Sequence, residues 1–315
     1  MVRGVLRIVR VCTVILLLIV VPSQEGYSVS GKVIAAVMSS DQPRYRDAHR
    51  SFVKSLAGRG YPAGTTEIIL QSPNPDQLSW SNTVRKFNAY RPDLIVAYGA
   101  PAAVTAMKES DGIPVVSVDV YATEKPLKGM CGASSRIPMV TLVRTLHDIR
   151  PYQRIGVIYS AREIGSLRQL DDIRHAASQH GMTVVEGNVT SAAALDGVLA
   201  TMLERCEAII VTEGSQGSRQ FERIVARAAA RNTPVIASMP DAADKGGLLS
   251  LEINPAEQGH LAAEIAARIL EGASPDHLTL LSPRRIDLVV NMRVARQMGI
   301  TVPFTVLGSA TRIIK

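Results

Sequence analysis

The chain contains one succession of segments twice, and this repeat restricts it to a pair of similar α/β lobes. The matching apolar runs lie, in order, at 32–37, 94–98 and 113–116 in the first copy and at 155–159, 208–212 and 233–236 in the second. From Val33 to Gly60 is 27 positions and from Ile155 to Gly181 is 26, so the leading strand and helix have nearly the same length in both copies. Two similar lobes leave a cleft between them, which indicates a ligand-binding clamp.

Short apolar runs alternate with amphipathic stretches along most of the chain. This alternation is typical of βαβ units and predicts parallel sheets, because parallel strands need a helical crossover. The runs are apolar almost throughout, as expected of strands that helices cover on both faces. Near the C-terminus the pattern predicts an amphipathic helix at 255–272, a strand at 286–290 and a short helix at 291–298.

The first 23 residues have the pattern of a secretory signal peptide. Three arginines lie within the first ten residues, an apolar stretch follows at 11–21, and Pro22 and Ser23 end it. A stretch of this length is too short to cross a bilayer as a helix, which needs about 20 residues. We expect cleavage after residue 23 and a periplasmic or other extracytoplasmic location, with a retained membrane anchor as the alternative.

The composition is that of a soluble globular protein, with 46% apolar and 20% charged residues. The net charge is +7, and residues 1–23 hold three arginines and no acid, so the excess without them is four. Basic residues are spread among acidic neighbours, and no nucleic-acid partner is expected. Cys131 and Cys206 either pair in an oxidising compartment or remain buried thiols. The spacings of common metal and nucleotide sites are missing from the sequence, so we expect no metal and no cofactor.

Several segments, taken together in order and spacing, resemble the bacterial ABC transporter substrate-binding proteins of the type I periplasmic-binding fold, in the branch that includes aromatic amino-acid binders. The resemblance covers about residues 31 to 310. It is carried by the segments at 91–103, 113–116, 155–159, 233–236, 258–267, 269–272, 287–291 and 295–299.

This resemblance implies a monomer that captures a small solute, such as an amino acid or a carboxylate-like molecule, and delivers it to the membrane permease of an ABC-type import system. It implies two Rossmann-like lobes that close about a hinge which the chain crosses three times, near Tyr121, Leu251 and Arg284. The expected lobes are 31–121 plus 252–283, and 122–251 plus 284–315.

Ligands of open α/β sheets bind beyond the carboxyl ends of the strands, so the residues after each apolar run are the candidates. In the first lobe, Gly99 permits a tight exit, and the free N–H groups of Ala102 and Ala103 after Ala100 are expected to point at a substrate carboxylate. The alternative is a small-residue turn that serves only packing. Ser39, Ser40 and Asp41 follow the first strand, where they contact the ligand or cap the next helix.

In the second lobe, Glu213 is expected to pair with a substrate ammonium, unless it or Ser215 beside Gly214 caps the next helix. The remaining strand-end candidates are Ser160, Ser238 and Asp241. Many relatives have Ser/Thr-Asp-Pro after the strand equivalent to 115–118, and Asp-Asn-Thr where this chain has 213–215. In place of the first motif this chain has a segment with Tyr121 and Thr123. The Tyr121 ring is expected either to stack on an aromatic or apolar solute or to pack in the core.

Two other functions are compatible with parts of the sequence. The segment 214–218 follows a strand like a nucleophile elbow, but it lacks the G-x-S-x-G spacing, so we expect no catalytic residue and no enzyme. The same clamp also serves in sensing modules, where it reports a ligand to a membrane receptor. The sequence does not separate sensing from transport, because the difference lies in the partner.

Overall fold

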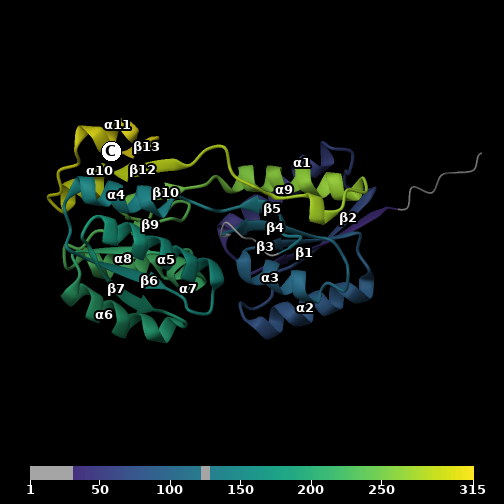
Figure 1. Cartoon of the computed structure of the whole chain (residues 1–315), viewed down its shortest axis with the longest axis horizontal. Coiled ribbons are helices and arrows are strands. Elements are labelled where there is room, and N and C mark those ends of the chain that lie inside the picture. The colour runs from purple at the N-terminus through teal and green to yellow at the C-terminus, as the bar shows by residue number, and fades with distance from the viewer. Residues whose placement is uncertain (1–30, 122–127) are drawn as a thin grey trace, which may run out of the picture. The chain divides into compact units, whose positions relative to one another are not determined.

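The computed structural model describes residues 31–121 and 128–315 of the 315-residue chain (Figure 1). The predicted signal segment 1–23 and the candidate Thr123 lie outside the described residues. The described part forms two α/β lobes, each built on its own largely parallel sheet, which confirms the predicted fold class. Among these residues no helix has the length and apolar character needed to span a membrane.

The first lobe holds a six-stranded sheet in which all neighbouring strands are parallel, in the order β11-β5-β4-β3-β1-β2. Its strands are β1 (Lys32–Met38), β2 (Thr66–Gln71), β3 (Leu94–Tyr98), β4 (Val115–Val120), β5 (Cys131–Ser134) and β11 (Leu280–Leu281). Its helices are α1 (Pro43–Ala57), α2 (Gln77–Tyr90), α3 (Ala100–Glu109), α9 (Pro255–Leu270) and the 3-10 turn η2 (Pro275–His277).

The second lobe holds a seven-stranded sheet in the order β13-β12-β10-β9-β8-β6-β7. Its neighbours are parallel except β10 and β12, which run antiparallel. The strands are β6 (Arg154–Tyr159), β7 (Thr183–Asn188), β8 (Ala208–Val211), β9 (Val235–Ala237), β10 (Leu249–Glu252), β12 (Asp287–Asn291) and β13 (Arg312–Ile314). The helices are α4 (Met139–Ile149), α5 (Ile164–Gln179), η1 (Ala192–Ala194), α6 (Leu195–Arg205), α7 (Ser215–Arg219), α8 (Phe221–Ala229), α10 (Met292–Gln297) and α11 (Phe304–Ser309).

Both faces of the central strands are buried, which explains why their sequences are apolar throughout. Along β1, Ile34, Ala36 and Met38 pack in one core with α1 and α9, while Ala35 and Val37 pack in another with α2 and α3. Successive side chains of a strand point to opposite faces of a sheet, so a strand between two helical layers needs an apolar residue at every position.

The first lobe extends beyond residue 121, where the sequence analysis placed its boundary. Strand β5 was expected in the second lobe, but it pairs with β4 and β11 in the sheet of the first. Its Gly132 has a φ of 128°, and a Cβ there would lie 1.9 Å from the Ser117 carbonyl oxygen. Such a short strand with glycine and serine lacks an apolar pattern, so the sequence does not reveal it.

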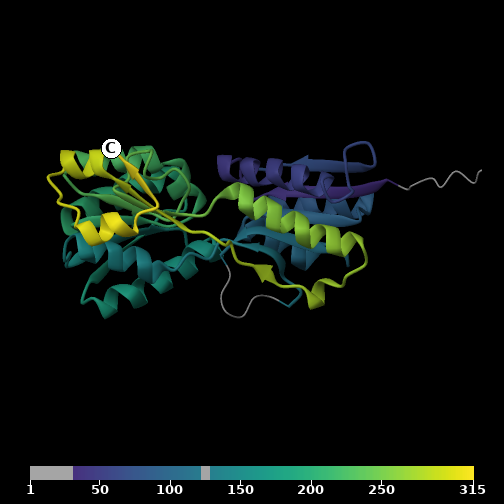
Figure 2. The ribbon, with the colours of Figure 1, turned by 90° about the horizontal axis from the view of Figure 1, so that it is seen from above.

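The later passages of the chain lie between β10 and α9, and between β11 and β12. Helix α9 packs on α1 and against β4 and β5, so the first lobe contains a helix from the C-terminal third of the chain. Figure 2 shows α1 and α9 running side by side.

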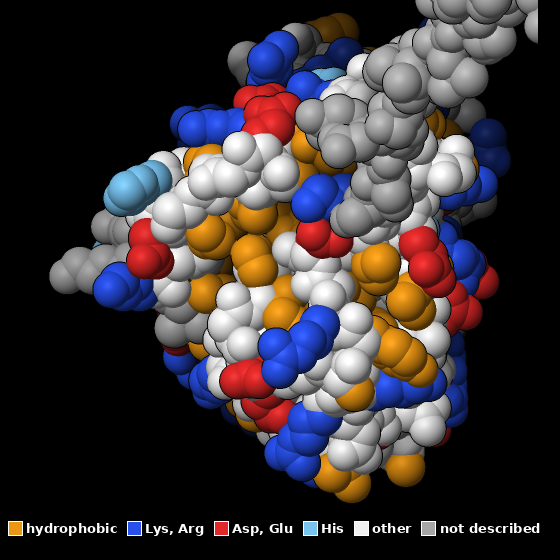
Figure 3. Space-filling model, turned by 90° about the vertical axis from the view of Figure 1, so that its right-hand side faces the viewer, with side chains coloured by type: hydrophobic (Ala, Val, Ile, Leu, Met, Phe, Trp, Pro, Cys, Tyr) orange, Lys and Arg blue, Asp and Glu red, His pale blue; other side chains and the backbone are white. Residues whose placement is uncertain are grey.

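Charged side chains of both signs are interspersed with apolar ones over the face of the molecule seen in Figure 3. The two described cysteines are free and buried, and they belong to different sheets or the loops beside them. Cys131 lies in β5 and packs in the core of the first lobe, whereas Cys206 precedes β8 and packs in the second.

Candidate functional site

The carboxyl ends of the two sheets meet at a buried polar cluster. We define this cluster as six side chains contributed by both lobes: Arg44, Asp119, Ser135, Gln169, Glu213 and Gln258. Arg44 Nη2 donates to the Glu213 carbonyl oxygen at 3.3 Å, and Ser135 Oγ donates to Glu213 Oε2 at 3.4 Å. These two bonds link residues of the first lobe to Glu213, which follows β8 in the sheet of the second lobe.

Arg44 lies at the centre of the polar cluster. It belongs to the first turn of α1, and its Nε lies 3.1 Å from Asp119 Oδ2 with only 11% of the side chain exposed. Its Nη2 also donates to the Tyr45 hydroxyl at 2.9 Å, and the guanidinium lies 4.8 Å from the centre of that ring. The surrounding negative groups outweigh burial and raise the Arg44 pKa, so the guanidinium is a permanent positive charge.

Asp119 enters the polar cluster from the end of β4. Its φ is 57°, a left-handed conformation that redirects the chain at the strand end. Gln258 Nε2, in the first turns of α9, donates to Asp119 Oδ1 at 3.0 Å and to the Ser134 carbonyl oxygen at 3.3 Å. Gln258 is 2% exposed, so a buried amide holds the Asp119 carboxylate in place.

Glu213 follows β8 and is 8% exposed. Its N–H donates to Gln169 Oε1 at 2.8 Å, and its Oε2 accepts from Gln169 Nε2 at 3.2 Å. The carboxyl group lies against the start of α5, where a Cβ on Gly165 would come within 2.0 Å of Oε1. The missing side chain at Gly165 leaves room for the Glu213 carboxyl, which a Cβ there would force to move.

The environment of Glu213 favours its neutral form. Burial is the largest cause and raises the Glu213 pKa, Arg44 opposes it, and the negative charges of Asp119 and Glu163 raise it further, to about 8. Glu213 therefore differs from an ordinary surface glutamate, because its burial and the neighbouring acids favour the protonated form.

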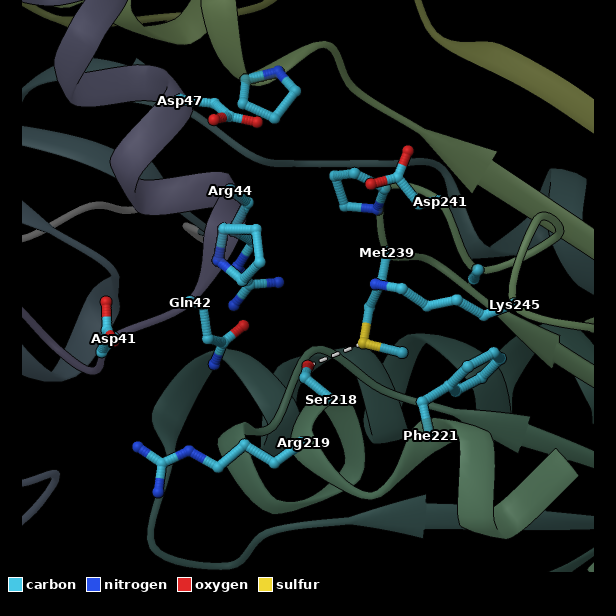
Figure 4. A pocket seen from close by; sticks show the side chains of 14 residues that line it. Asp41, Gln42, Arg44, Asp47, Ser218, Arg219, Phe221, Met239, Asp241 and Lys245 are labelled. Carbon is cyan, nitrogen blue, oxygen red and sulfur yellow. Dashed lines mark hydrogen bonds between the residues drawn. The ribbon is translucent and has the colours of Figure 1, made fainter. Parts of the chain in front are cut away.

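A pocket lies beside the polar cluster and is lined by both lobes (Figure 4). It encloses about 750 Å³ of empty space, which includes open solvent at its mouth. Arg44 and Asp41 line it from the start of α1, and Phe221, Met239 and Lys245 line it from the second lobe. Apolar surface next to fixed charges is the usual make-up of a small-molecule site.

A second pocket borders the other side of the lobe boundary. It is lined by Gln77 and Trp80 of α2, and by Ser160, Glu163 and Ser215 of the second lobe. Trp80 Nε1 donates to the Ser39 carbonyl oxygen at 3.1 Å, which ties α2 to the end of β1.

The N–H groups predicted to bind a carboxylate at the start of α3 are not free. The Ala102 N–H donates to Ser39 Oγ at 3.0 Å, and the Ala103 N–H donates to the Gly99 carbonyl oxygen at 3.0 Å. Ala100, Ala102 and Ala103 are buried in the core of the first lobe. Gly99 has the left-handed φ expected of a tight exit, 87°, but the Tyr45 and Ser39 hydroxyls lie directly over it. The loop therefore has the form of the alternative stated above, a turn of small residues that serves packing.

The other first-lobe candidates divide between buried and exposed positions. Ser40 is buried and its Oγ accepts from Gln42 Nε2 at 3.0 Å. Asp41 lies at the pocket mouth and forms an exposed ion pair with Arg46. Tyr121 does not face the cleft: its ring packs in the core of the second lobe, and its hydroxyl donates to Asp172 Oδ2 at 2.6 Å.

In the second lobe, neither Glu213 nor Ser215 caps α7. The Glu163 carboxylate does so, accepting from the Ser215 N–H at 3.0 Å and from Ser215 Oγ at 2.8 Å. Ser160 is buried, and its N–H donates to Ser166 Oγ.

The last two candidates lie near the polar cluster and the first pocket. Ser238 Oγ donates to Gln169 Oε1 at 3.2 Å, which places it at the edge of the polar cluster. Asp241 is exposed, has a φ of 61° and lines the first pocket. The buried Gly214 connects Glu213 to α7.

Sequence reasoning misses Arg44, Asp119, Gln169 and Gln258, although two of them leave a signal. Arg44 stands in the first turn of a helix that has no acid there, and a cation at that end opposes the helix dipole. Asp119 is the only charged residue in the six-residue strand β4. Residues that break a local rule in this way are often functional.

Comparison with known proteins places this geometry in a family. The model of the family described as ABC transporter substrate binding protein matches residues 33–314. A "Tyrosine-binding protein" of Clostridioides difficile is 24% identical over 263 residues, which are 80% of this chain and 76% of that protein.

Solved structures share the fold. The ABC domain from Streptococcus pneumonia in complex with L-Trp superposes with a TM-score of 0.85 at 23% identity, covering 90% of this chain and 100% of that one. A conserved domain protein from Vibrio cholerae gives 0.84 at 23% identity, covering 90% and 99%. Proteins of this family bind small solutes outside the cytoplasm and work with a membrane permease rather than as catalysts. The match over nearly the whole described chain shows that this protein belongs to the ABC transporter substrate-binding protein family.

Proposed function

We propose that the protein captures an amino acid or a related carboxylate-bearing solute between its lobes and delivers it to the permease of an ABC-type import system. The observation that carries this proposal is the meeting of both sheets' carboxyl ends at the polar cluster, beside a pocket lined by both lobes. Groups of both signs and apolar side chains lie within that region, which suits a zwitterion with an apolar side chain.

The relatives support an amino acid over other solutes. One protein of similar sequence is named for binding tyrosine, and one of similar fold was solved with L-Trp. A solute-binding protein from Burkholderia graminis solved with D-arabinose is less similar, with a TM-score of 0.65 and 15% identity.

Capture in this proposal involves closure about the hinge and no covalent chemistry. The hydroxyl of Ser215 is bound to Glu163, and Ser218 Oγ lies against the Met239 sulfur. We further propose that the chain is exported by its N-terminal segment and acts as a monomer.

A thermal-shift screen of amino acids, small carboxylates, nucleosides and sugars tests the solute class. A ligand at 100 times its Kd adds about 2.7 kcal/mol of apparent stability, so a true solute raises the Tm clearly. We expect the largest shift from an amino acid. A shift from sugars or nucleosides alone would contradict the proposed solute class.

A further inference from the structure

Tyr121 belongs to the first lobe by its backbone and to the second by its side chain. It directly follows β4, an inner strand of the first sheet, whereas its ring is 1% exposed and packs in the core of the second lobe. Protein cores are close-packed, so a ring inserted in this way moves with the core around it. Tyr121 therefore joins the end of β4 to the body of the second lobe.

Helix α5 of the second lobe holds both ends of this residue. Asp172 Oδ2 accepts a hydrogen bond from the Tyr121 hydroxyl at 2.6 Å, and Arg168 Nη1 donates to the Tyr121 carbonyl oxygen at 3.4 Å. Asp172 and Arg168 are four positions apart, so they lie on the same face of the helix, one turn from each other. The contact with Asp172 is the shorter of the two, and a hydrogen bond to a carboxylate is about twice as strong as one between neutral groups.

The Tyr121 hydroxyl has a second acceptor in the first passage of the chain between the lobes, residues 135–138. The Ile137 carbonyl oxygen, in this passage, lies 3.0 Å from the hydroxyl. Burial is the largest cause that raises the Tyr121 pKa, and Asp172 raises it further, so the hydroxyl keeps its one proton. Asp172 and Ile137 therefore share a single donor.

We propose that Tyr121 is the pivot of lobe closure, a positioning residue that Asp172 and Arg168 fix to the second lobe while the first passage moves past its hydroxyl. This inference rests on the proposed function. The two acceptors differ in their surroundings, because Asp172 is on a helix of 16 residues whereas Ile137 is in a connecting segment, where hinge motion is absorbed. The Ile137 contact is therefore the one that changes as the lobes move, and the Asp172 contact persists.

A pivot of this kind limits the orientations that the lobes adopt. Without the hydroxyl, the ring still fills its place in the core, but neither Asp172 nor Ile137 has its donor. The lobes then sample a wider range of orientations, and a smaller fraction of molecules has the arrangement that encloses a solute. Since the apparent Kd equals the intrinsic Kd divided by that fraction, Tyr121→Phe should weaken solute binding by about three- to tenfold.

Distances between spin labels, measured by double electron–electron resonance, test the pivot directly in the free protein. The labels are attached at Lys86→Cys in α2 and Ala200→Cys in α6, which are exposed positions of different lobes, while the native cysteines are buried. We expect a broader distribution of distances in Tyr121→Phe than in the wild type. The matched control is Tyr152→Phe, since Tyr152 is buried in the same core and its hydroxyl has no hydrogen-bond partner among the described residues.

Asp172 supplies a second pair of variants, which decides the question even if Tyr121→Phe does not fold. Asp172→Asn keeps an oxygen that accepts from the hydroxyl, so it should retain most of the wild-type distribution. Asp172→Ala removes the acceptor and should broaden the distribution. Calorimetry with L-tyrosine and L-tryptophan should rank the affinities of these variants in the same order.

The pivot is refuted if Tyr121→Phe keeps the wild-type distances, if Tyr152→Phe broadens them equally, or if Asp172→Ala behaves as Asp172→Asn does. A screen in which no amino acid binds to the wild type would instead refute the proposed function, and the distances in the free protein would still decide the role of Tyr121.

Discussion

Arg44 shows how much a single residue contributes to the boundary between the lobes. Its guanidinium contacts Asp119 in the first lobe and the Glu213 carbonyl oxygen in the second, with little exposure to solvent. Charges paired away from water stabilise little when complete, but the loss of one partner leaves the other buried and uncompensated.

Arg44→Met should therefore lower the free energy of unfolding by about 3 kcal/mol, because Asp119 loses its only ion-pair partner among the described residues. The matched control is Arg46→Met, two positions along the same helix, whose pair with Asp41 is exposed and should be worth less than about 1 kcal/mol. Urea denaturation measures both. Equal losses would show that the Arg44 pair is no more than a surface contact.

The raised pKa of Glu213 has its own effect on stability. The folded protein keeps the proton up to about pH 8, whereas an unfolded glutamate loses it near pH 4.5. Between these values the folded state binds more protons, so stability is greatest below the lower pKa and falls as the pH rises towards the upper one, by at most about 1.4 kcal/mol per unit. Denaturation of wild type and Glu213→Gln from pH 5 to 9 should show a smaller decline in the variant. Parallel pH profiles would contradict this prediction.

The residues that the sequence reveals and those it hides differ in physical kind. Residues 32–37 and 208–212 are recognisable as strands because burial on both faces leaves an apolar run, and Glu213 follows from its place after such a run. The pairing of Arg44 with Asp119, or Gln258 with the same carboxylate, joins positions far apart in the chain. No local pattern encodes which strand end those side chains reach.

Among the elements, α1 and α9 form the closest helix pair of the first lobe. A Cβ on Gly259 would lie 2.0 Å from the Ala48 carbonyl oxygen and 2.8 Å from the Phe52 nitrogen. Ser51 Oγ donates to the Ala256 carbonyl oxygen at 2.6 Å across the same contact. The glycine thus allows backbone to approach backbone, and it holds Gln258 next to the polar cluster.

Gly259→Ala should destabilise the protein by about 1–3 kcal/mol or more, because the helices must separate. Gly197→Ala serves as the control, since an alanine Cβ at this exposed position of α6 would have no neighbouring atom within 4 Å and alanine is the better helix former. Thermal unfolding should show a lower Tm for the first variant and an unchanged or higher Tm for the second. A neutral Gly259→Ala would refute the close packing.

At the scale of the whole molecule, no disulfide joins the lobes within the part of the chain that the structure describes. Cys131 and Cys206 are free, and burial raises the pKa of Cys131 to about 11 and also raises that of Cys206. Buried, protonated thiols react slowly.

We expect neither Cys131 nor Cys206 to react with Ellman's reagent in the native protein, and both to react after unfolding without a reductant. A variant in which Cys131 is replaced provides the reference. It should show one thiol fewer after unfolding, and its loss of stability should be no larger than that of an ordinary core substitution. The absence of free thiols after unfolding would mean that the cysteines pair.

The indole of Trp80, which is hydrogen-bonded to the end of β1, provides the molecule with an intrinsic fluorescent probe. Trp80 is the only tryptophan in the chain, and its indole lines the pocket between α2 and the second lobe. Indole emission responds to local polarity, so any movement of the lobes that wets or dries this ring should change the intrinsic fluorescence. Solute capture can therefore be followed in real time by stopped flow, with no label attached.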